Sequence, residues 1–244
     1  MPTPLTFGGF DLNRYAYVQL ERQPGPSLRS YTQEVSGRSG EAFLGATLEP
    51  LVVIAHCTLR RSYVRDWDAV RSALEAAFCV TERKQLTLPD EGGLTRMASA
   101  TFSSTASEPV DPPVEFDITF TDHDACAYGA TRTATVPSGG SVSVTVDGTL
   151  PTYPVLSCAS AVRSTSTNLW GVRLDNGDVL RVDTGSDSAR RVDIDCCNRT
   201  CKVAWATSMI TLDSNWFVLT PGTHTLRMDQ GSGSCSITWR ERWL

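Results

Sequence analysis

The densest group of residues that could do chemistry is a cysteine cluster made of Cys196, Cys197 and Cys201. Thiolates bind zinc tetrahedrally, and zinc ribbons supply them from two Cys-x-x-Cys pairs. This cluster has no matching second pair, although Cys158 or Cys235 could approach it in space. The spacing leaves a metal site, a disulfide and free thiols open, and we expect free thiols. We therefore assign no metal and no cofactor, and keep the three clustered cysteines as the candidate ligands.

Histidine and carboxylate side chains are the second candidate chemistry. His123 lies between Asp122 and Asp124, an arrangement that could serve a metal or general acid–base catalysis. No second histidine motif accompanies it, so the polar end of a strand explains it better. The sequence has no Gly-x-Ser-x-Gly elbow, phosphate-binding loop, dinucleotide fingerprint or His-Glu-x-x-His helix. We expect that the protein is not an enzyme.

Aromatic residues could bind a ligand in the second half of the chain. Tryptophans can stack on sugar rings, although a tryptophan in a strand more often belongs to the core. Trp216 is our candidate for contact with a glycan, and carbohydrate binding at the host surface is the alternative function. A glycosidase would need two carboxyl groups at a set separation, which a sequence does not give. The tryptophans considered are Trp170, Trp205, Trp216, Trp239 and Trp243.

Composition limits the classes of partner. The chain has 244 residues, of which 41% are hydrophobic and 20% charged, and a net charge of −5. An acidic balance argues against a dedicated nucleic-acid binder, which would present a basic face. The first residues resemble no signal peptide, and the longest apolar run, Leu51 to Ala55, is too short to cross a bilayer. We expect synthesis in the cytoplasm and no membrane insertion.

Strands and one helix must position these residues. The cleanest alternation in the first half places Val114, Phe116, Ile118 and Phe120 on one face, which predicts a half-buried strand. Residues 85–90 and 95–102 predict a hairpin joined through Gly92 and Gly93. One amphipathic helix is predicted over 66–78, because its apolar residues fall on one stripe. Those residues are Trp67, Val70, Leu74, Ala77 and Phe78.

The second half predicts about seven or eight short strands. Asn176-Gly177 is a strong hairpin signal. Near the end, Trp216 and Val218 alternate with other residues, and Leu226 and Met228 continue the pattern after a turn. We predict a mainly β chain with three parts. Residues 1–130 form an N-terminal β-sandwich with one helix, 131–140 form a linker, and 141–244 form a C-terminal jelly-roll type β-sandwich.

Several segments occur in a distinctive order along the chain. They are the loop Gly37 to Gly40, the helix, Leu86-Thr-Leu-Pro-Asp90, Arg96-Met-Ala98, Val114 to Phe120, Tyr153-Pro-Val-Leu156, Asn176 to Asp183, Asn215 to Leu226 and Thr238 to Trp243. In this order they resemble the distal tail protein (Dit) family of long-tailed phages with flexible tails. Two features depart from the family. The chain has His123 where the family commonly has proline, and the cysteine cluster is not a family feature.

The resemblance implies a structural virion protein. Its N-terminal sandwich would form a homo-oligomeric ring, which we expect to be a hexamer, and its C-terminal sandwich would be galectin-like. The implied ring joins the tail tube protein to the tail-tip or baseplate hub protein, with the tape-measure protein and a receptor-binding protein as further partners. DNA would pass through the lumen without specific binding.

The resemblance also implies a location and a contact region. The protein would be assembled in the host cytoplasm and would lie at the tail tip of the virion. We expect contacts between subunits or with partners at the loop formed by Gly37, Arg38, Ser39 and Gly40.

Overall fold

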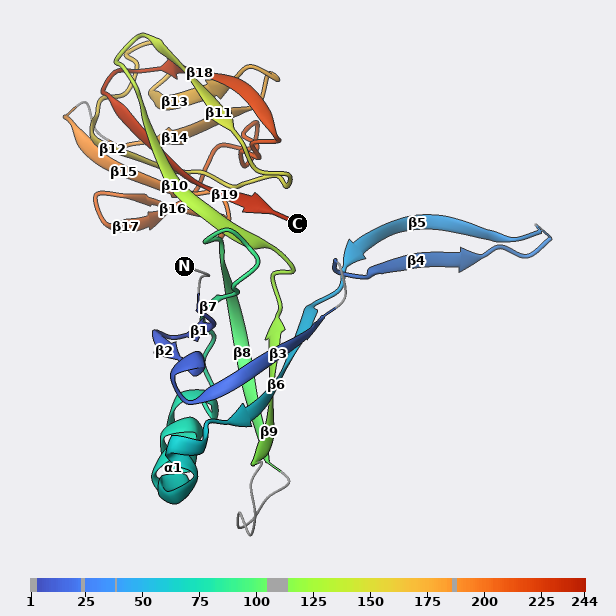
Figure 1. The fold of residues 1–244 in the computed structure, drawn as a ribbon. Helices are drawn as coiled ribbons and strands as arrows, with labels where there is room; N and C mark the ends of the chain where they lie inside the picture. Colours follow the sequence, from blue (N-terminus) through green and yellow to red (C-terminus); the bar gives the residue numbers. More distant parts are fainter. Residues whose placement is uncertain (1–3, 23–24, 38, 105–113, 186–187) are drawn as a thin grey trace. The chain divides into compact units, whose positions relative to one another are not determined.

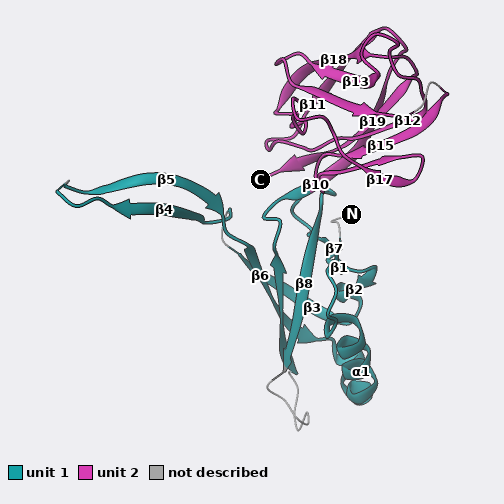
Figure 2. Ribbon diagram, turned by 180° about the vertical axis from the view of Figure 1, so that it is seen from behind, with its two compact units in different colours: residues 1–127, 244 teal, residues 128–243 magenta. Residues whose placement is uncertain are grey.

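The chain folds into two compact units, each with its own hydrophobic core. A computed structural model describes residues 4–22, 25–37, 39–104, 114–185 and 188–244. Unit 1 comprises residues 1–127 with Leu244, and unit 2 comprises residues 128–243 (Figures 1 and 2). Strands predominate in both units, which confirms the prediction of a mainly β chain. Among the described residues, no helix has the length and apolar character needed to span a bilayer.

Unit 1 is built on one antiparallel sheet. Phe116, Ile118 and Phe120 point into its core, so the alternation predicted there is confirmed. The hairpin predicted through Gly92 and Gly93 is also confirmed. In spatial order the strands are β3 (Ala16–Arg22), β6 (Leu51–Leu59), β9 (Glu115–Asp122), β8 (Thr95–Ser104), β7 (Lys84–Thr87), β1 (Thr6–Phe7) and β2 (Phe10–Asp11).

The predicted helix covers one face of this sheet. It is α1 (Trp67–Phe78), entered from the 3-10 helix η2 (Arg61–Asp66); a shorter one, η1 (Leu12–Arg14), follows β2. Four residues of the expected apolar stripe of α1 are buried, namely Trp67, Val70, Leu74 and Phe78, and Ala77 is half-buried. The ring of Phe78 lies 5.6 Å from that of Phe7 and 6.0 Å from that of Phe120, measured between centroids. Among the described residues of unit 1, no helix covers the opposite face of the sheet.

Strands β4 (Leu28–Glu34) and β5 (Glu41–Leu48) form a separate two-stranded ribbon in unit 1. It is inserted in the chain between β3, at one edge of the sheet, and the neighbouring strand β6. Figure 1 shows the ribbon extending beyond the edge of that sheet.

Unit 2 is a sandwich of two antiparallel sheets around one core, as the sequence predicted. The hairpin at Asn176-Gly177 is confirmed, with Gly177 at φ 97°. One sheet has the order β17 (Ala206–Ser208), β16 (Thr200–Val203), β15 (Arg190–Asp195), β12 (Val155–Ala161), β19 (Cys235–Trp243) and β10 (Ala127–Val136). The other has the order β11 (Ser141–Val146), β18 (Gly222–Gln230), β13 (Leu169–Leu174) and β14 (Val179–Asp183).

Two local expectations are corrected. The segment 131–140, expected to be a linker, contains most of strand β10 and the turn into β11. Its run of threonines and valine suits an extended strand, which pairs with β19. Near the C-terminus the buried positions are shifted by one residue from the predicted Trp216 and Val218. Phe217 and Leu219 are fully buried, whereas Val218 is 37% exposed.

Candidate assembly surfaces

The ribbon formed by β4 and β5 has no buried face. Leu28, Phe43 and Leu44 are 67%, 68% and 65% exposed. The register pairs Leu28 with Leu48 and Thr32 with Phe43, which places Leu28, Phe43 and Leu48 on the same side of the ribbon. An isolated two-stranded ribbon is marginally stable in water. This ribbon therefore presents apolar side chains that a second surface would cover.

The ribbon ends in the predicted glycine loop. Gly37 and Gly40 both have φ of 79°, a left-handed conformation that glycine adopts without steric cost. Ser39 is exposed, and Arg38 lies outside the described residues. The loop is thus the tip of a hairpin, and the contact role of its four residues stays a prediction.

On the uncovered face of the unit 1 sheet, His56 links two carboxylates. Its Nδ1 lies 2.8 Å from Oδ1 of Asp117, and its Nε2 lies 2.9 Å from Oε2 of Glu21. Hydrogen bonds with Glu21 and then Asp117 raise the pKa of His56 above its ordinary value. The sequence did not reveal this group, because it depends on the pairing of β3, β6 and β9.

The same face is acidic. Glu21, Glu115 and Asp117 occupy outward positions on β3 and β9, and Glu21 and Asp117 are 71% and 50% exposed. The described outward positions of β3, β6, β8 and β9 contain no lysine or arginine. Beyond the end of β6, the guanidinium of Arg60 lies 4.4 Å from the ring centroid of Tyr17. This face would repel polyanions.

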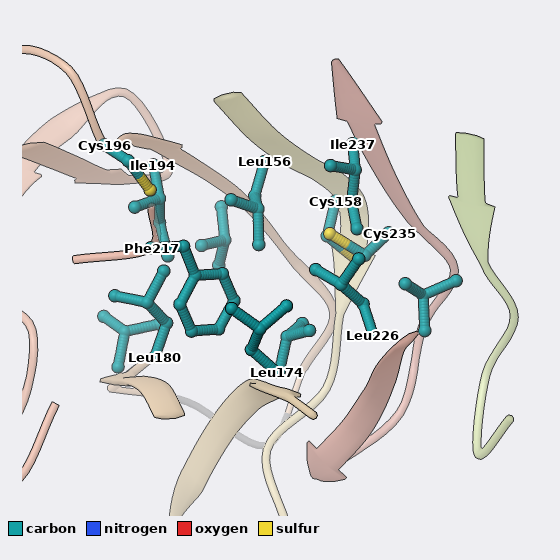
Figure 3. Packing of buried hydrophobic residues seen from close by; sticks show 14 of the residues in the cluster. Leu156, Cys158, Leu174, Leu180, Ile194, Cys196, Phe217, Leu226, Cys235 and Ile237 are labelled. Atoms are coloured by element: carbon teal, nitrogen blue, oxygen red, sulfur yellow. The ribbon is translucent and has the colours of Figure 1, made fainter. Parts of the chain in front are cut away.

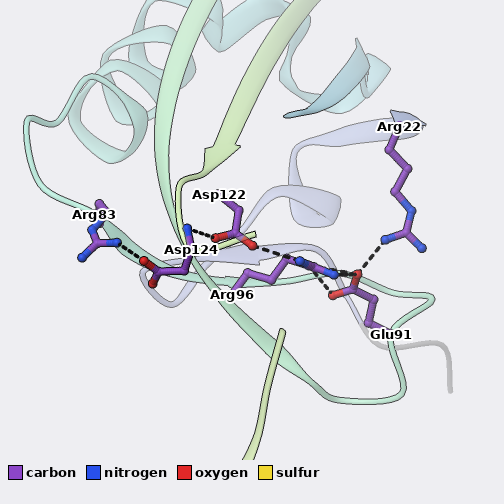
Figure 4. Close-up of polar contacts among 6 residues, drawn as sticks. All are labelled: Arg22, Arg83, Glu91, Arg96, Asp122 and Asp124. Atoms are coloured by element: carbon purple, nitrogen blue, oxygen red, sulfur yellow. Dashed lines mark hydrogen bonds and ion pairs between the residues drawn. The ribbon is translucent and has the colours of Figure 1, made fainter. Parts of the chain in front are cut away.

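A buried group of charged residues joins β8, β9 and the β7–β8 loop (Figure 4). Arg96 is 4% exposed and Asp122 1%. Nη1 of Arg96 donates to Asp122 at 2.9 Å, and Nη2 donates to Glu91 at 2.8 Å. Arg22 donates to the same Glu91 at 2.6 Å. Since all four charged groups are paired inside unit 1, the cluster fixes the sheet rather than forming a reactive site.

Burial and pairing act in opposite directions on these pKa values. Burial raises the pKa of Asp122, and the Arg96 guanidinium opposes that rise without cancelling it. Burial alone would lower the pKa of Arg96, but its hydrogen bonds with Glu91 and Asp122 outweigh burial and raise it. The pairing therefore keeps Arg96 charged beside its two carboxylates.

The Asp-His-Asp motif does not form one site. Asp122 points inward to Arg96, whereas Asp124 accepts from Arg83 at 2.8 Å. His123 Nε2 lies 3.1 Å from the hydroxyl of Ser99. The three side chains thus have three separate partners, as a polar strand end would.

The clustered cysteines take part in the packing of unit 2. Cys196 lies in its core (Figure 3). Cys201 is also buried there, and Cys197 is exposed. Burial raises the pKa of Cys196 to about 12 and that of Cys201 to about 11, which disfavours the thiolate that zinc would need. Cys158 and Cys235 face each other on β12 and β19. Among the described residues no disulfide forms, and no group of His, Cys, Asp or Glu is placed to hold a metal.

Unit 2 places its tryptophans in different environments. Trp170 is fully buried, and Trp239 is 6% exposed. Trp216, the candidate for glycan contact, is half-buried and packs against the core. Trp205 is 72% exposed, which its position among strand residues did not suggest. Trp205 is therefore better placed than Trp216 to meet a ligand.

Comparison with known proteins finds a sequence match in unit 2 and a fold match over both units. The sequence profile of the siphovirus-type tail component, C-terminal domain, matches residues 147–243. The structure of the SPP1 Dit (gp 19.1) protein, described as a paradigm of hub adsorption apparatus in Gram-positive infecting phages, aligns over 99% of each chain. The TM-score is 0.77 and the identity 18%, so this match is evidence of a shared fold.

The resemblance to the distal tail proteins is confirmed. Residues 147–243 match the siphovirus-type tail component profile, and the whole chain shares the fold of the SPP1 distal tail protein. A chain of the phage p2 baseplate, in its activated conformation with Sr, is a more distant neighbour, with TM-score 0.50, 7% identity and coverage of 95% of this chain and 92% of that one. No curated protein matches the chain in sequence. Distal tail proteins are structural components of phage tails rather than enzymes.

Proposed function

We propose that this protein is the subunit of a ring-shaped tail-tip hub, closed by the β4–β5 ribbon of each copy docking on its neighbour. The observation that carries the proposal is the ribbon itself. Phe43 and Leu28 present apolar side chains on a strand pair that no other described part of unit 1 covers. A contact between unlike surfaces of identical chains repeats around an axis and closes when the rotation permits.

The partners follow from the distal tail fold. The SPP1 relative is described as a hub of an adsorption apparatus, which supports a junction between the tail tube and the tail-tip or baseplate hub protein. We propose a hexamer at that junction, with the tape-measure and receptor-binding proteins as further contacts. Assembly would take place in the host cytoplasm before the virion is released.

The acidic face of the unit 1 sheet supports a lumen that does not hold DNA. Glu21, Glu115 and Asp117 face outward from the sheet with no lysine or arginine among the described outward positions of its four main strands. If this face lines the ring, like charges would repel DNA and let it pass without specific binding.

Mass photometry of the purified chain tests the proposal. We expect particles at a multiple of the 26.5 kDa chain mass, about six-fold for a hexamer, and closed rings by negative-stain microscopy. Phe43→Glu should shift the population to single chains, because a buried unpaired charge at the contact is costly. Leu212→Glu is the matched control, since Leu212 is an exposed apolar residue like Phe43 but lies in unit 2. A wild-type chain that stays single under all conditions would refute the proposal.

A further inference from the structure

The turn between β16 and β17 has an unusual backbone. It consists of Ala204 and Trp205, whose φ values are 47° and 72°. Two-residue hairpin turns with both φ values positive favour Asn-Gly, because a bulky side chain in this region is sterically strained. Trp205 is nevertheless 72% exposed, so burial of its indole does not offset the strain. A strained, exposed aromatic residue is a reason to look for a binding role.

The indole of Trp205 is held in place from one side. The guanidinium of Arg191 lies 4.7 Å from the ring centroid. Asp193 fixes that guanidinium, accepting from Nε at 2.6 Å and from Nη2 at 2.9 Å, and also accepts from Ser157 at 2.6 Å. The turn is tied to the same strand, because the Ala204 amide donates to the Arg191 carbonyl at 2.8 Å. The aromatic surface is therefore preorganised before any ligand arrives.

Polar groups continue from the indole along the same face of the sheet. The register places Asp193, Lys202 and Thr207 side by side on β15, β16 and β17. No hydrogen bond or ion pair of the Lys202 ammonium is found among the described residues, although it lies near enough to Asp193 to help lower the pKa of that carboxyl. Carboxylate, ammonium and hydroxyl groups can bond the hydroxyls of a sugar, and an exposed indole can cover the apolar face of its ring.

The surface around Trp205 is less suited to a protein partner than to a sugar. Aromatic residues that anchor protein interfaces lie in pockets ringed by groups that exclude water. Around Trp205 the neighbouring positions on β15 and β16 carry charged side chains instead. Arg191 is about two-fifths exposed and Asp193 a quarter, so they remain within reach of a ligand.

We propose that Trp205, Arg191, Asp193 and Lys202 form a binding site for a pyranose ring of a glycan. Trp205 supplies the stacking surface, Arg191 supports it from the other side, and Asp193 and Lys202 bind sugar hydroxyls. The site goes beyond the hub function and does not require ring closure. It also moves the glycan contact that the sequence suggested at Trp216 to a side chain that is open to solvent.

Trp205→Gly separates binding from folding. Glycine adopts a φ of 72° without strain, so we expect the thermal unfolding midpoint to stay the same or to rise. The labelled full-length protein should bind hexose or hexosamine oligosaccharides on a glycan array. For the best oligosaccharide, Trp205→Gly should weaken the affinity at least about tenfold, as expected for loss of an aromatic anchor. Lys202→Ala should weaken it less, and Met209→Ala, an exposed apolar position, should leave it unchanged.

Nuclear magnetic resonance provides a second readout. The indole N–H signal that disappears in Trp205→Gly is that of Trp205, and it should shift when the same oligosaccharide is added to the wild type. If the glycine variant fails to fold, Trp205→Asn takes its place, because asparagine also tolerates this backbone region. The proposal is overturned if no oligosaccharide on the array binds and the Trp205 indole signal does not shift. It is also overturned if the Trp205 variant binds the best oligosaccharide with the same affinity as the wild type. If no glycan binds, and if the Trp205 variant no longer captures another tail protein that the wild type captures, the surface is assigned to a protein partner instead.

Discussion

The two units bury their apolar residues to different extents. In unit 2, two sheets enclose a core in which Phe217 lies among Leu156, Leu174 and Leu180 (Figure 3). In unit 1, α1 covers one face of the sheet, and Phe43 stays exposed on the ribbon. Unit 2 thus encloses its core between its own two sheets, whereas unit 1 keeps apolar and acidic surfaces available for other chains. The contrast separates residues that stabilise the fold from residues available for assembly.

The largest effect expected is on the core of unit 2. Phe217→Ala should cost about 3–5 kcal/mol of unfolding free energy, because it leaves a cavity in a fully enclosed site. Phe43→Ala should change the unfolding free energy of the single chain by less than about 0.5 kcal/mol. Chemical denaturation at a concentration where the protein is a single chain measures both. Equal losses in the two variants would remove the contrast between the units.

A similar loss is expected inside unit 1 from breaking its buried charges. Arg96→Met leaves Asp122 buried without its guanidinium, which should cost about 3–5 kcal/mol. Arg83→Met breaks the more exposed pair with Asp124 and should cost at most about 1 kcal/mol. The two variants differ in burial but remove the same side-chain type. An Arg96→Met protein as stable as the wild type would show that the cluster does not fix the sheet.

Acid should weaken unit 2 through Asp229. Burial alone would raise the pKa of Asp229, but hydrogen bonds from Arg181 and Arg173 outweigh it and hold the pKa below the ordinary 3.8. A lowered folded-state pKa contributes stability above the unfolded value, and that stability is lost as the pH falls through the folded value. Asp229→Asn should therefore be less stable at neutral pH and lose less stability below about pH 4. Denaturation curves across this range measure the difference, with Asp147→Asn as an exposed control. If the unfolding free energies of wild type and Asp229→Asn change in parallel with pH, Asp229 is not the source of the acid sensitivity.

The smallest effect concerns the exposed face of unit 1. Because Glu21 and Asp117 raise the pKa of His56 above 6.5, its protonated form stabilises the fold below that value. The contribution is lost as the pH rises through the raised pKa. Titration of the imidazole signals by nuclear magnetic resonance should give a value above 6.5, and Glu21→Gln or Asp117→Asn should lower it. A wild-type value at or below the ordinary one would show that the three side chains are not linked in solution.

Sequence periodicity predicted the elements whose signals are local. The alternation from Val114 to Phe120 and the turn at Asn176-Gly177 depend on neighbouring residues only, and both are confirmed. The same alternation, continued from Phe120 by two residues, also places Asp122 inward. Its partner Arg96 was not predictable, since it meets Asp122 through the register of β8 and β9.

The remaining errors come from tertiary context. Trp216 and Phe217 are both aromatic, so the pattern alone does not say which of them points inward. Trp205 looked like a core aromatic because its turn contains neither glycine nor asparagine. The exposure of the β4–β5 ribbon was also hidden, because a strand that awaits a partner has the same residue types as one that is already covered.

Hydrogen–deuterium exchange of the ribbon tests the assembly account most directly. Amides of β4 and β5 should exchange rapidly in a sample diluted to single chains and slowly in the assembled sample, because a neighbour then covers the ribbon. Amides of β12 and β19, inside the unit 2 sandwich, should exchange at the same rate in both samples. Equal exchange of the ribbon in the two samples would contradict the claim that β4 and β5 join one copy to the next.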